Sequence, residues 1–343
     1  MIDQIFSIRL QYFIHSPVLR LGLKGKLMSK LHASIKMSVV MTLVCLIGIL
    51  TGCVSSQKVV AYPAMVNHSI NNIKKLNQPK IALILGSGGA RGYAHIGVIQ
   101  VLEQRGLKPD FIVGSSAGSV VGAVYASGKT AEQVEKIAME LKPSDVRDFT
   151  LSLQGFFNGE KIQNYINGLV DNKPLEQLAI PMYVVATELQ QGQQVVFNQG
   201  NTGQAVRAST TIPSMFIPTK IGDAEYVDGG LVSPLPVLVA KELGADFIIA
   251  VDILARPQYT ETAHIWGLFN QNINVMQNQL AKNEAQWADV LIQPDIREKA
   301  HIFSTKSRAE TIEAGRVAAR LQMEKIDQLL LKRQNLALVS SVQ

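Results

Sequence analysis

Cysteine is almost absent from this sequence. Its 343 residues include two cysteines, Cys45 and Cys53, and both lie near the N-terminus. Residues 54–343 therefore cannot form an internal disulfide or a cysteine-based metal site. Hydrophobic residues make up 47% of the chain and aromatic residues 6%. These values are ordinary for a globular enzyme built from one large α/β domain or two small domains.

A strong excess of charge is also lacking over most of the chain. The formal net charge is +6, but residues 1–52 alone carry a net charge of +5. This charge comes from Asp3 and six basic residues, Arg9, Arg20, Lys24, Lys26, Lys30 and Lys36. Residues 53–343 keep a net charge of only +1, which argues against nucleic acid as a partner.

The apolar run near the N-terminus is short for a membrane span. Residues 37–50 contain no charged side chain and lead into Leu50-Thr51-Gly52-Cys53. A run of this length is typical of a signal peptide. Leu-Thr-Gly-Cys resembles the lipobox of bacterial lipoproteins, which implies cleavage before Cys53 and lipid attachment to it. The alternative, an anchor helix with an incidental cysteine, fits less well because small residues and Cys53 stand where cleavage would need them.

We therefore expect residues 1–52 to be a lipoprotein signal peptide, with translation starting at Met28, which would give a signal of normal length. Residues 53–79 are polar, show no clear period and are expected to be a tether. The residue after Cys53 is Val54 and not aspartate. By the same resemblance to bacterial lipoproteins, this implies a protein that is anchored in the outer membrane and faces the periplasm.

The strongest local pattern spans residues 111–124. Three apolar residues, Phe111-Ile112-Val113, predict the end of a buried strand, and the G-x-S-x-G motif from Gly114 to Gly118 predicts a sharp turn into a helix. A serine at such a corner has its hydroxyl pushed out of the chain, so Ser116 is the predicted nucleophile. Taken alone the motif is only moderately specific, because it also occurs in glycine-rich turns that close a βα unit.

A second glycine-rich turn precedes this motif. Residues 80–86 predict a buried strand, residues 86–92 a glycine-rich loop, and residues 93–105 a helix. Such a loop directs backbone N–H groups at one point, as an anion site requires. A dinucleotide site is disfavoured because Arg91 stands where the G-x-G-x-x-G fingerprint needs glycine. An oxyanion hole fits better, because Gly88 and Gly89 would lie beside the strand that leads to Ser116.

The rest of the chain alternates between strands and helices. A lone acid, Asp228, follows an apolar pair and precedes Gly229-Gly230; such a residue is usually a turn residue, but in a serine hydrolase it would stand at a strand end where a general base is needed. The apolar segment from Phe149 to Phe157, which includes Leu151, Leu153 and Phe156, predicts either a lip over the site or, more commonly, buried loop packing. Further strands are expected at 180–186, 193–198, 246–251 and 290–292, and helices at 130–141, 161–169, 204–209, 236–243, 266–288 and 308–334.

Three motifs in this order resemble the patatin-like phospholipases, and in particular the compact bacterial relatives of neuropathy target esterase. They are the glycine loop 88–92, the elbow 114–118 and Asp228-Gly229-Gly230. The stretches 186–189 and 205–209 resemble the family's connecting segments. The resemblance implies a three-layer α/β/α sandwich with a mainly parallel central sheet over residues 80–300, with residues 301–343 forming a C-terminal helix packed on it and a short tail.

The resemblance also implies a Ser-Asp dyad that hydrolyses acyl esters of phospholipids or lysophospholipids. Ser116 would be the nucleophile and Asp228 the base. Gly88, Gly89 and Ala90 would form the oxyanion hole. The supporting positions of the motifs are Arg91, Gly92, Gly114, Gly118, Gly229 and Gly230. No metal and no cofactor is expected, because the sequence shows no cluster of ligands. The membrane, reached through the lipid anchor, is the expected partner.

Two other interpretations stay open. An ordinary α/β-hydrolase would use serine, aspartate and histidine in this chain order and would recruit His264 or His301. His95 precedes the serine and is expected to be structural. A non-catalytic lipid-binding lipoprotein could keep the same motifs, and only chemistry at Ser116 would distinguish it from an enzyme.

Overall fold

The structure, a computed structural model, describes residues 79–150, 152–259, 262–263, 265–296 and 307–340. The predicted signal peptide, Met28, Cys53 and nearly all of the predicted tether lie outside the described residues. Within the described part of the chain, no helix is long and apolar enough to cross a membrane.

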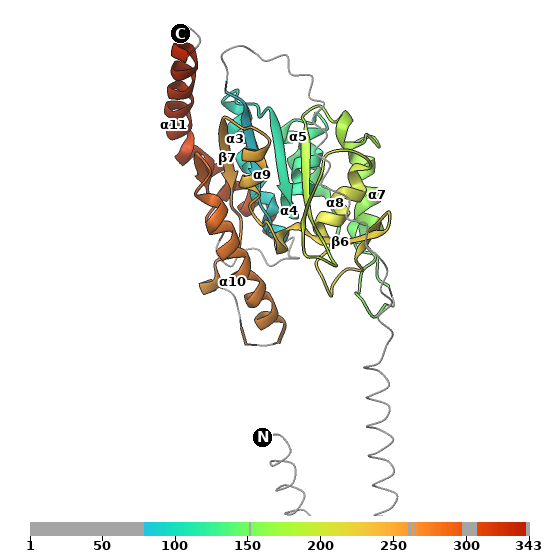
Figure 1. Cartoon of the computed structure of the whole chain (residues 1–343). Helices are drawn as coiled ribbons and strands as arrows, with labels where there is room; N and C mark the ends of the chain where they lie inside the picture. Colours follow the sequence, from blue (N-terminus) through green and yellow to red (C-terminus); the bar gives the residue numbers. More distant parts are fainter. Residues whose placement is uncertain (1–78, 151, 260–261, 264, 297–306, 341–343) are drawn as a thin grey trace, which may run out of the picture. The chain divides into compact units, whose positions relative to one another are not determined.

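A mixed sheet forms the centre of the described domain (Figure 1). Its strand order is β5-β6-β3-β2-β1-β7-β8, with β4 paired to β3. The run from β3 to β8 is parallel, whereas β4, β5 and β6 pair antiparallel. The strands are β1 (Ile81–Leu85), β2 (Phe111–Ser115), β3 (Met182–Glu188), β4 (Gln194–Phe197), β5 (Thr219–Ile221), β6 (Ala224–Asp228), β7 (Phe247–Val251) and β8 (Val290–Ile292).

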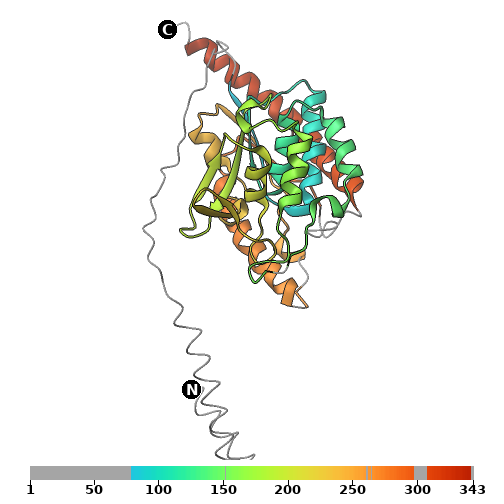
Figure 2. The same ribbon diagram turned by 90° about the vertical axis from the view of Figure 1, so that its right-hand side faces the viewer.

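Helices cover both faces of this sheet, which confirms the predicted three-layer fold (Figure 2). One face carries α3 (Tyr93–Gln104), α4 (Ala117–Ala126), α5 (Ala131–Glu140), α7 (Glu160–Leu169), α8 (Thr202–Thr210) and α11 (Arg308–Ser340). The other face carries α9 (Val237–Glu242) and α10 (Ile265–Ala285). Short helices connect them: η2 (Gly89–Gly92), α6 (Pro143–Val146), η3 (Leu175–Gln177), η4 (Gly229–Leu231) and η5 (Pro257–Tyr259).

The central strands are apolar on both sides because each face of the sheet meets a helical layer. In β1, Leu83 and Leu85 belong to the core on the α3 side, and Ala82 and Ile84 to the core on the α9 side. This alternation follows from the two-residue period of a strand. It also explains why residues 81–85 appear in the sequence as an uninterrupted apolar run rather than an alternating one.

The C-terminal helix α11 packs directly on the backbone of α3. A Cβ on Gly97 would lie 1.9 Å from the carbonyl oxygen of Ile312, and one on Gly315 would lie 2.0 Å from that of Ala94. Neither position tolerates a side chain at this separation, so the two glycines allow the helices to touch. Figure 2 shows α11 running along this helical layer.

Three helices differ by two or more residues at one end from the sequence prediction, and one of them, α11, continues to Ser340 instead of ending at residue 334. The helix expected at 204–209 begins at Thr202, because the Asn201 side chain accepts the Gln204 N–H and caps it. The helix expected to reach residue 288 ends at Ala285, where the chain turns and the Trp287 N–H bonds to the Glu284 carbonyl.

Candidate active site

Ser116 occupies the sharp turn between β2 and α4. Its φ of 50° and ψ of −118° lie in a region that side-chain-bearing residues rarely adopt. The turn is tight because Gly118 approaches β1, where a Cβ would lie 1.9 Å from the Leu85 carbonyl oxygen. The predicted elbow geometry is therefore present, and the positive end of α4 points at Ser116.

Three hydrogen bonds fix the backbone around Ser116. Its N–H donates to Ser209 Oγ at 2.8 Å, and Ser209 Oγ donates in turn to the Val185 carbonyl at 2.6 Å. The Ser116 carbonyl accepts from Ser119 Oγ at 2.7 Å. Ser209 is not among the site residues predicted from the sequence, although it lies in the segment 205–209 that resembles the family. Its position on α8 places it beside the elbow.

Asp228 lies at the end of β6 and faces Ser116. Ser116 Oγ donates to Asp228 Oδ2 at 2.6 Å, across 112 positions of sequence. The Gly230 N–H donates to Asp228 Oδ1 at 2.7 Å, and Thr187 Oγ1 donates to the Asp228 carbonyl at 2.8 Å. Pairing of β6 with β3, and of β3 with β2, brings the aspartate to the serine.

The environment of Asp228 favours a proton-accepting role. The residue is only 4% exposed, and this burial raises the pKa of its carboxyl to about 6. The hydrogen bonds from Ser116 and Gly230 act in the opposite direction, because they stabilise the carboxylate. At neutral pH the group is thus mostly ionised, yet it is a stronger base than an ordinary aspartate.

The glycine loop forms η2 next to Ser116. Gly89, Ala90 and Gly92 line the same pocket as Ser116. Because Gly89 and Ala90 begin a short helix, their N–H groups have no acceptor inside it. Gly88 is not part of this lining. It packs on Ile253, whose Cδ1 would lie 2.7 Å from a Cβ at this position.

Arg91 holds this loop against the end of β7. The side chain is buried, and its Nε donates to the Ile253 carbonyl at 2.8 Å. Burial lowers the pKa of Arg91 to about 10, while the nearby Asp252 carboxylate opposes this change. The guanidinium is therefore still charged at neutral pH. Because Arg91 is buried, it is not a solvent-exposed cation at the start of a helix, which would be the simplest role for an arginine at this position.

The remaining motif glycines mark close approaches. The would-be Cβ atoms meet their nearest neighbours at 3.0 Å for Gly92 (Ala117 Cβ), 2.7 Å for Gly114 (Gly118 carbonyl oxygen), 2.2 Å for Gly229 (Val185 carbonyl oxygen) and 2.6 Å for Gly230 (Gln277 Nε2). A side chain at Gly92 or Gly114 would crowd the elbow and its helix α4, and one at Gly229 would crowd β3. All three motifs thus converge on one site.

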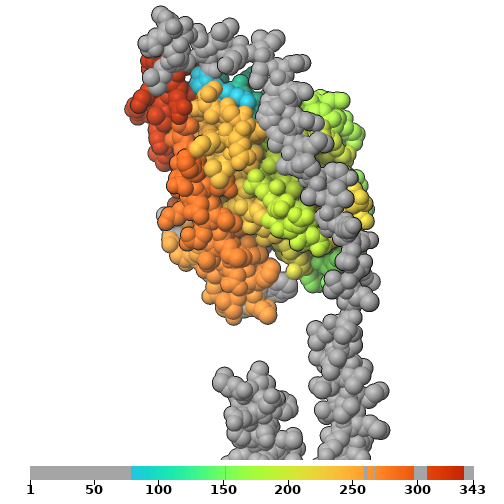
Figure 3. All heavy atoms as spheres, viewed as in Figure 1, coloured from blue at the N-terminus to red at the C-terminus, as the bar shows by residue number. Residues whose placement is uncertain are grey.

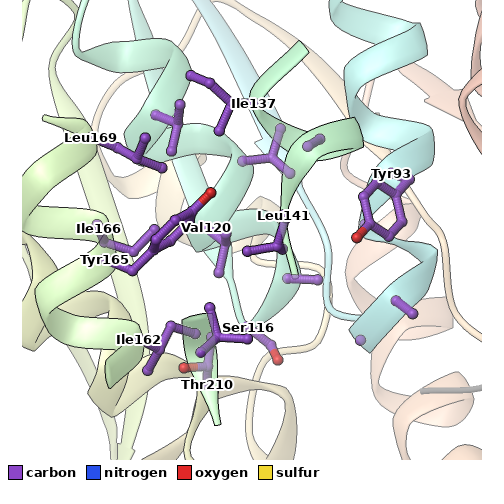
Figure 4. A pocket seen from close by; sticks show the side chains of 18 of the residues that line it. Tyr93, Ser116, Val120, Ile137, Leu141, Ile162, Tyr165, Ile166, Leu169 and Thr210 are labelled. Atoms are coloured by element: carbon purple, nitrogen blue, oxygen red, sulfur yellow. The ribbon is translucent and has the colours of Figure 1, made fainter. Parts of the chain in front are cut away.

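An apolar pocket of about 250 Å³ opens from Ser116 (Figure 4). In Figure 4, Ser116 and Thr210 lie at one end and Ile137 and Leu169 at the other. The wall between them is almost entirely hydrocarbon. It includes Ile96, Val120, Val121, Val124, Val134, Leu141, Val146, Ile162, Ile166, Ile212 and Phe216. A site of this kind suits an alkyl chain with its polar end at the serine.

The histidines take no described part in this arrangement. His95 is fully buried on α3, and its Nε2 lies 2.9 Å from the Gly86 carbonyl oxygen. Burial lowers the pKa of His95 to about 4, as suits a structural neutral ring. His264 and His301 lie outside the described residues. Within the described ranges, no three His, Cys, Asp or Glu side chains are grouped so as to hold a metal ion.

Comparison with known proteins agrees with this geometry. Residues 83–241 match the family model of the patatin-like phospholipases. The crystal structure of VipD from Legionella pneumophila aligns with a TM-score of 0.52 at 14% identity, over 72% of this chain and 67% of that one. The domain has the patatin fold.

Two curated patatin-like relatives illustrate the similarity in sequence. An uncharacterized NTE family protein of Mycobacterium tuberculosis is 40% identical over 53% of this chain and 51% of its own length. The human patatin-like phospholipase domain-containing protein 6 is 31% identical over 64% of this chain and 16% of its own. The chain thus spans about half the length of the first relative. Together these matches show that the described domain resembles the patatin-like phospholipase family in sequence and in fold.

Proposed function

We propose that this protein is a serine acyl hydrolase that cleaves acyl esters of phospholipids or lysophospholipids. One observation carries the proposal: Ser116 Oγ donates directly to the buried carboxylate of Asp228 at 2.6 Å, at the end of an apolar pocket. A buried base with a raised pKa can activate a serine without histidine.

The reaction follows from these positions. Ser116 Oγ attacks the acyl carbonyl carbon while its proton passes to Asp228. The N–H groups of Gly89 and Ala90, with that of Gly88 beside them, stabilise the oxyanion. When the tetrahedral intermediate collapses, the ester C–O bond breaks and the leaving alcohol takes the proton from Asp228. Water then attacks the acyl-enzyme and gives a proton to Asp228. The proton returns to Ser116 Oγ as the fatty acid leaves.

The pocket supports an acyl group rather than a polar substrate. Apart from the oxyanion loop, Ser116, Thr210, Arg147 and the hydroxyl groups of Tyr93 and Tyr165, the side chains that line the pocket are apolar. Burial of hydrocarbon is worth about 0.8 kcal/mol per methylene. An acyl chain bound here would therefore hold its ester carbonyl at Ser116.

The direct Ser-Asp bond favours the dyad over a Ser-Asp-His triad. In a triad the histidine stands between the two residues, and the carboxylate orients the ring. Here both Asp228 oxygens are engaged, Oδ2 by Ser116 and Oδ1 by Gly230. A double variant, His264→Ala/His301→Ala, tests the alternative, because a triad would lose its base whereas the dyad would not.

We also propose that Cys53 carries a lipid anchor and places the protein in the outer membrane, facing the periplasm. Support comes from the Leu50-Thr51-Gly52-Cys53 pattern and from Val54. Metabolic labelling with a fatty acid tests this directly. Label should enter wild-type protein and be lost in Cys53→Ala, and retention of label in that variant would refute lipidation at this residue.

The catalytic proposal is tested with the full chain purified in detergent. Wild type should react with a fluorophosphonate and release p-nitrophenol from short- and medium-chain esters, whereas Ser116→Ala should do neither and Asp228→Asn should do both roughly 100-fold or more slowly. A matched control is Ser233→Ala, because Ser233 Oγ donates at 2.6 Å to Glu284 in a second buried serine–carboxylate pair. It should keep its labelling. Folded wild type without turnover or labelling would favour the non-catalytic lipid-binding protein.

A further inference from the structure

Residues 148–150 and 152–158 pair with each other as the two sides of a hairpin beside the pocket. Phe149 and Phe157 make an antiparallel bridge, and the Thr150 N–H donates to the Phe156 carbonyl at 3.0 Å. At its base the Asn158 N–H donates to the Asp148 carbonyl at 3.0 Å, and the Gly159 N–H donates to Asp148 Oδ1 at 2.8 Å. These bonds hold the hairpin in one shape.

The hairpin exposes large apolar side chains. Phe149 is 82% exposed, Leu153 108% and Phe156 55%. We call these three residues the tip patch. From the sequence, burial of this segment is the commoner expectation, and the exposure of all three side chains contradicts it. An apolar cluster that stays in water is unfavourable unless another surface covers it.

The tip patch is joined to the pocket by a row of aromatic rings. The Phe149 and Phe157 ring centroids are 4.8 Å apart, and those of Phe157 and Phe216 are 5.3 Å apart. Phe216 lines the pocket that opens from Ser116. The N–H groups of Phe156 and Phe157 both donate to the Met215 carbonyl, at 2.9 and 3.0 Å. Apolar surface thus runs without interruption from the tip patch to the pocket wall.

A second apolar element flanks the same end of the domain. The first turn of α10 exposes Ile265 and Leu268. In Figure 1 the start of α10 and the green loop before α7 both project at the lower end of the domain, and Figure 3 shows the start of α10 at the lower surface. Two apolar projections thus lie at the same end of the domain.

A flat lipid surface fits this feature better than a protein does. A stable protein interface buries about 800 Å² on each partner, far more than three side chains at the end of a hairpin supply. Insertion into a bilayer needs only a few apolar side chains that reach past the headgroups. Charges from residue 140 to residue 161 nearly balance, with four acidic and three basic side chains, so anionic lipid is not required.

We propose that the tip patch inserts into a zwitterionic phospholipid bilayer and passes acyl chains along Phe157 and Phe216 into the pocket. The acyl-transfer route rests on the proposed function, whereas insertion itself does not. The patch is therefore a specificity element for lipid presented in a membrane. It should contribute little to hydrolysis of an ester dissolved in water.

The test compares two triple variants of the full chain, incorporated from detergent into phosphatidylcholine vesicles. Phe149→Ser/Leu153→Ser/Phe156→Ser removes the tip patch. Val317→Ser/Leu321→Ser/Leu331→Ser removes three exposed apolar side chains of α11 and serves as the matched control. The first should lower hydrolysis of vesicle phospholipid and lysophospholipid roughly tenfold or more, and change that of a soluble short-chain ester by less than about twofold. The control should change neither rate.

Insertion is measured separately from catalysis in a Ser116→Ala background. Leu153→Trp should gain fluorescence that brominated phosphatidylcholine quenches, and Leu321→Trp should not. Absence of quenching at position 153 would overturn the docking proposal even if the enzyme is active. An equal loss of both rates in the tip variant would also overturn it, as would a concentration-dependent dimer that the tip variant abolishes. Quenching in a chain that never reacts with a fluorophosphonate would overturn the proposed function alone.

Discussion

Replacement of Asp228 by asparagine should stabilise the protein at neutral pH while it strongly lowers activity. Burial raises the pKa of this carboxyl from 3.8 to about 6. Between these two pH values the folded state binds more protons than the unfolded state, so the free energy of unfolding falls as pH rises through the folded pKa. Above about pH 6 the full penalty of the buried charge is present.

The size of this penalty follows from the pKa difference. Each pH unit of difference corresponds to about 1.36 kcal/mol, so a pKa raised by about two units costs roughly 3 kcal/mol. Asparagine cannot ionise and escapes this cost. Its amide keeps one oxygen to accept from the Gly230 N–H, but it replaces the oxygen that accepts from Ser116 Oγ. The stability that Asp228→Asn gains at neutral pH is therefore smaller than the penalty of the buried charge. The change of this gain with pH should still have nearly the size that the pKa difference gives.

Urea unfolding of wild type and Asp228→Asn at pH 4 and pH 8 measures this effect. The stability of the variant relative to wild type should be roughly 2.5 kcal/mol more favourable at pH 8 than at pH 4, because the unfolded carboxyl is already partly ionised at pH 4. Asp171→Asn is the matched control, because Asp171 is exposed, and it should show no such pH dependence. A relative stability of Asp228→Asn that is equal at the two pH values would refute the buried-charge argument.

The raised pKa of Asp228 also determines how activity depends on pH. For wild type, kcat/KM should rise with pH and level off with an apparent pKa of about 6, because Asp228 must be deprotonated to accept the Ser116 proton. Asp228→Asn should lower kcat/KM by roughly 100-fold to 10,000-fold, the usual range for loss of a general base. Substantial activity in this variant with the wild-type pH profile would exclude Asp228 as the base.

Two further predictions concern α11 and the pocket. Gly315→Ala should lower the free energy of unfolding by about 1–3 kcal/mol, because its Cβ would lie 2.0 Å from the Ala94 carbonyl oxygen. Val317→Ala, at an exposed position of the same helix, is the control and should change stability little. An unchanged melting temperature for Gly315→Ala would contradict the close packing. Ile137→Trp should fill the end of the pocket that lies away from Ser116, and should therefore reduce kcat/KM for long-chain but not for short-chain p-nitrophenyl esters. Met139→Trp, at an exposed position, is the control. Equal effects on all chain lengths would argue against an acyl pocket.

Local patterns were sufficient to predict several parts of the site. The elbow at Ser116 and the glycine loop before α3 could be predicted because their structure depends on neighbouring residues: an apolar strand, glycines at close approaches and a helix start. The resemblance of three ordered motifs then added Asp228, for which the residues alone favoured a plain turn. It also implied the three-layer fold, which the structure bears out.

Contacts between distant segments were decided only by the tertiary structure. The support of the Ser116 N–H by Ser209 depends on where α8 settles against the elbow, and no local period in the sequence encodes that. The tip patch shows the same limit. An apolar run at 149–157 reports hydrophobicity, but not which side of a hairpin faces the domain, so Phe157 packs inward against Phe216 while Leu153 projects into solvent. The sequence alone thus determined the chemistry of the individual motifs, because that is local. Tertiary packing decided which groups meet, because their contacts join distant residues such as Ser116 and Asp228, which are 112 positions apart.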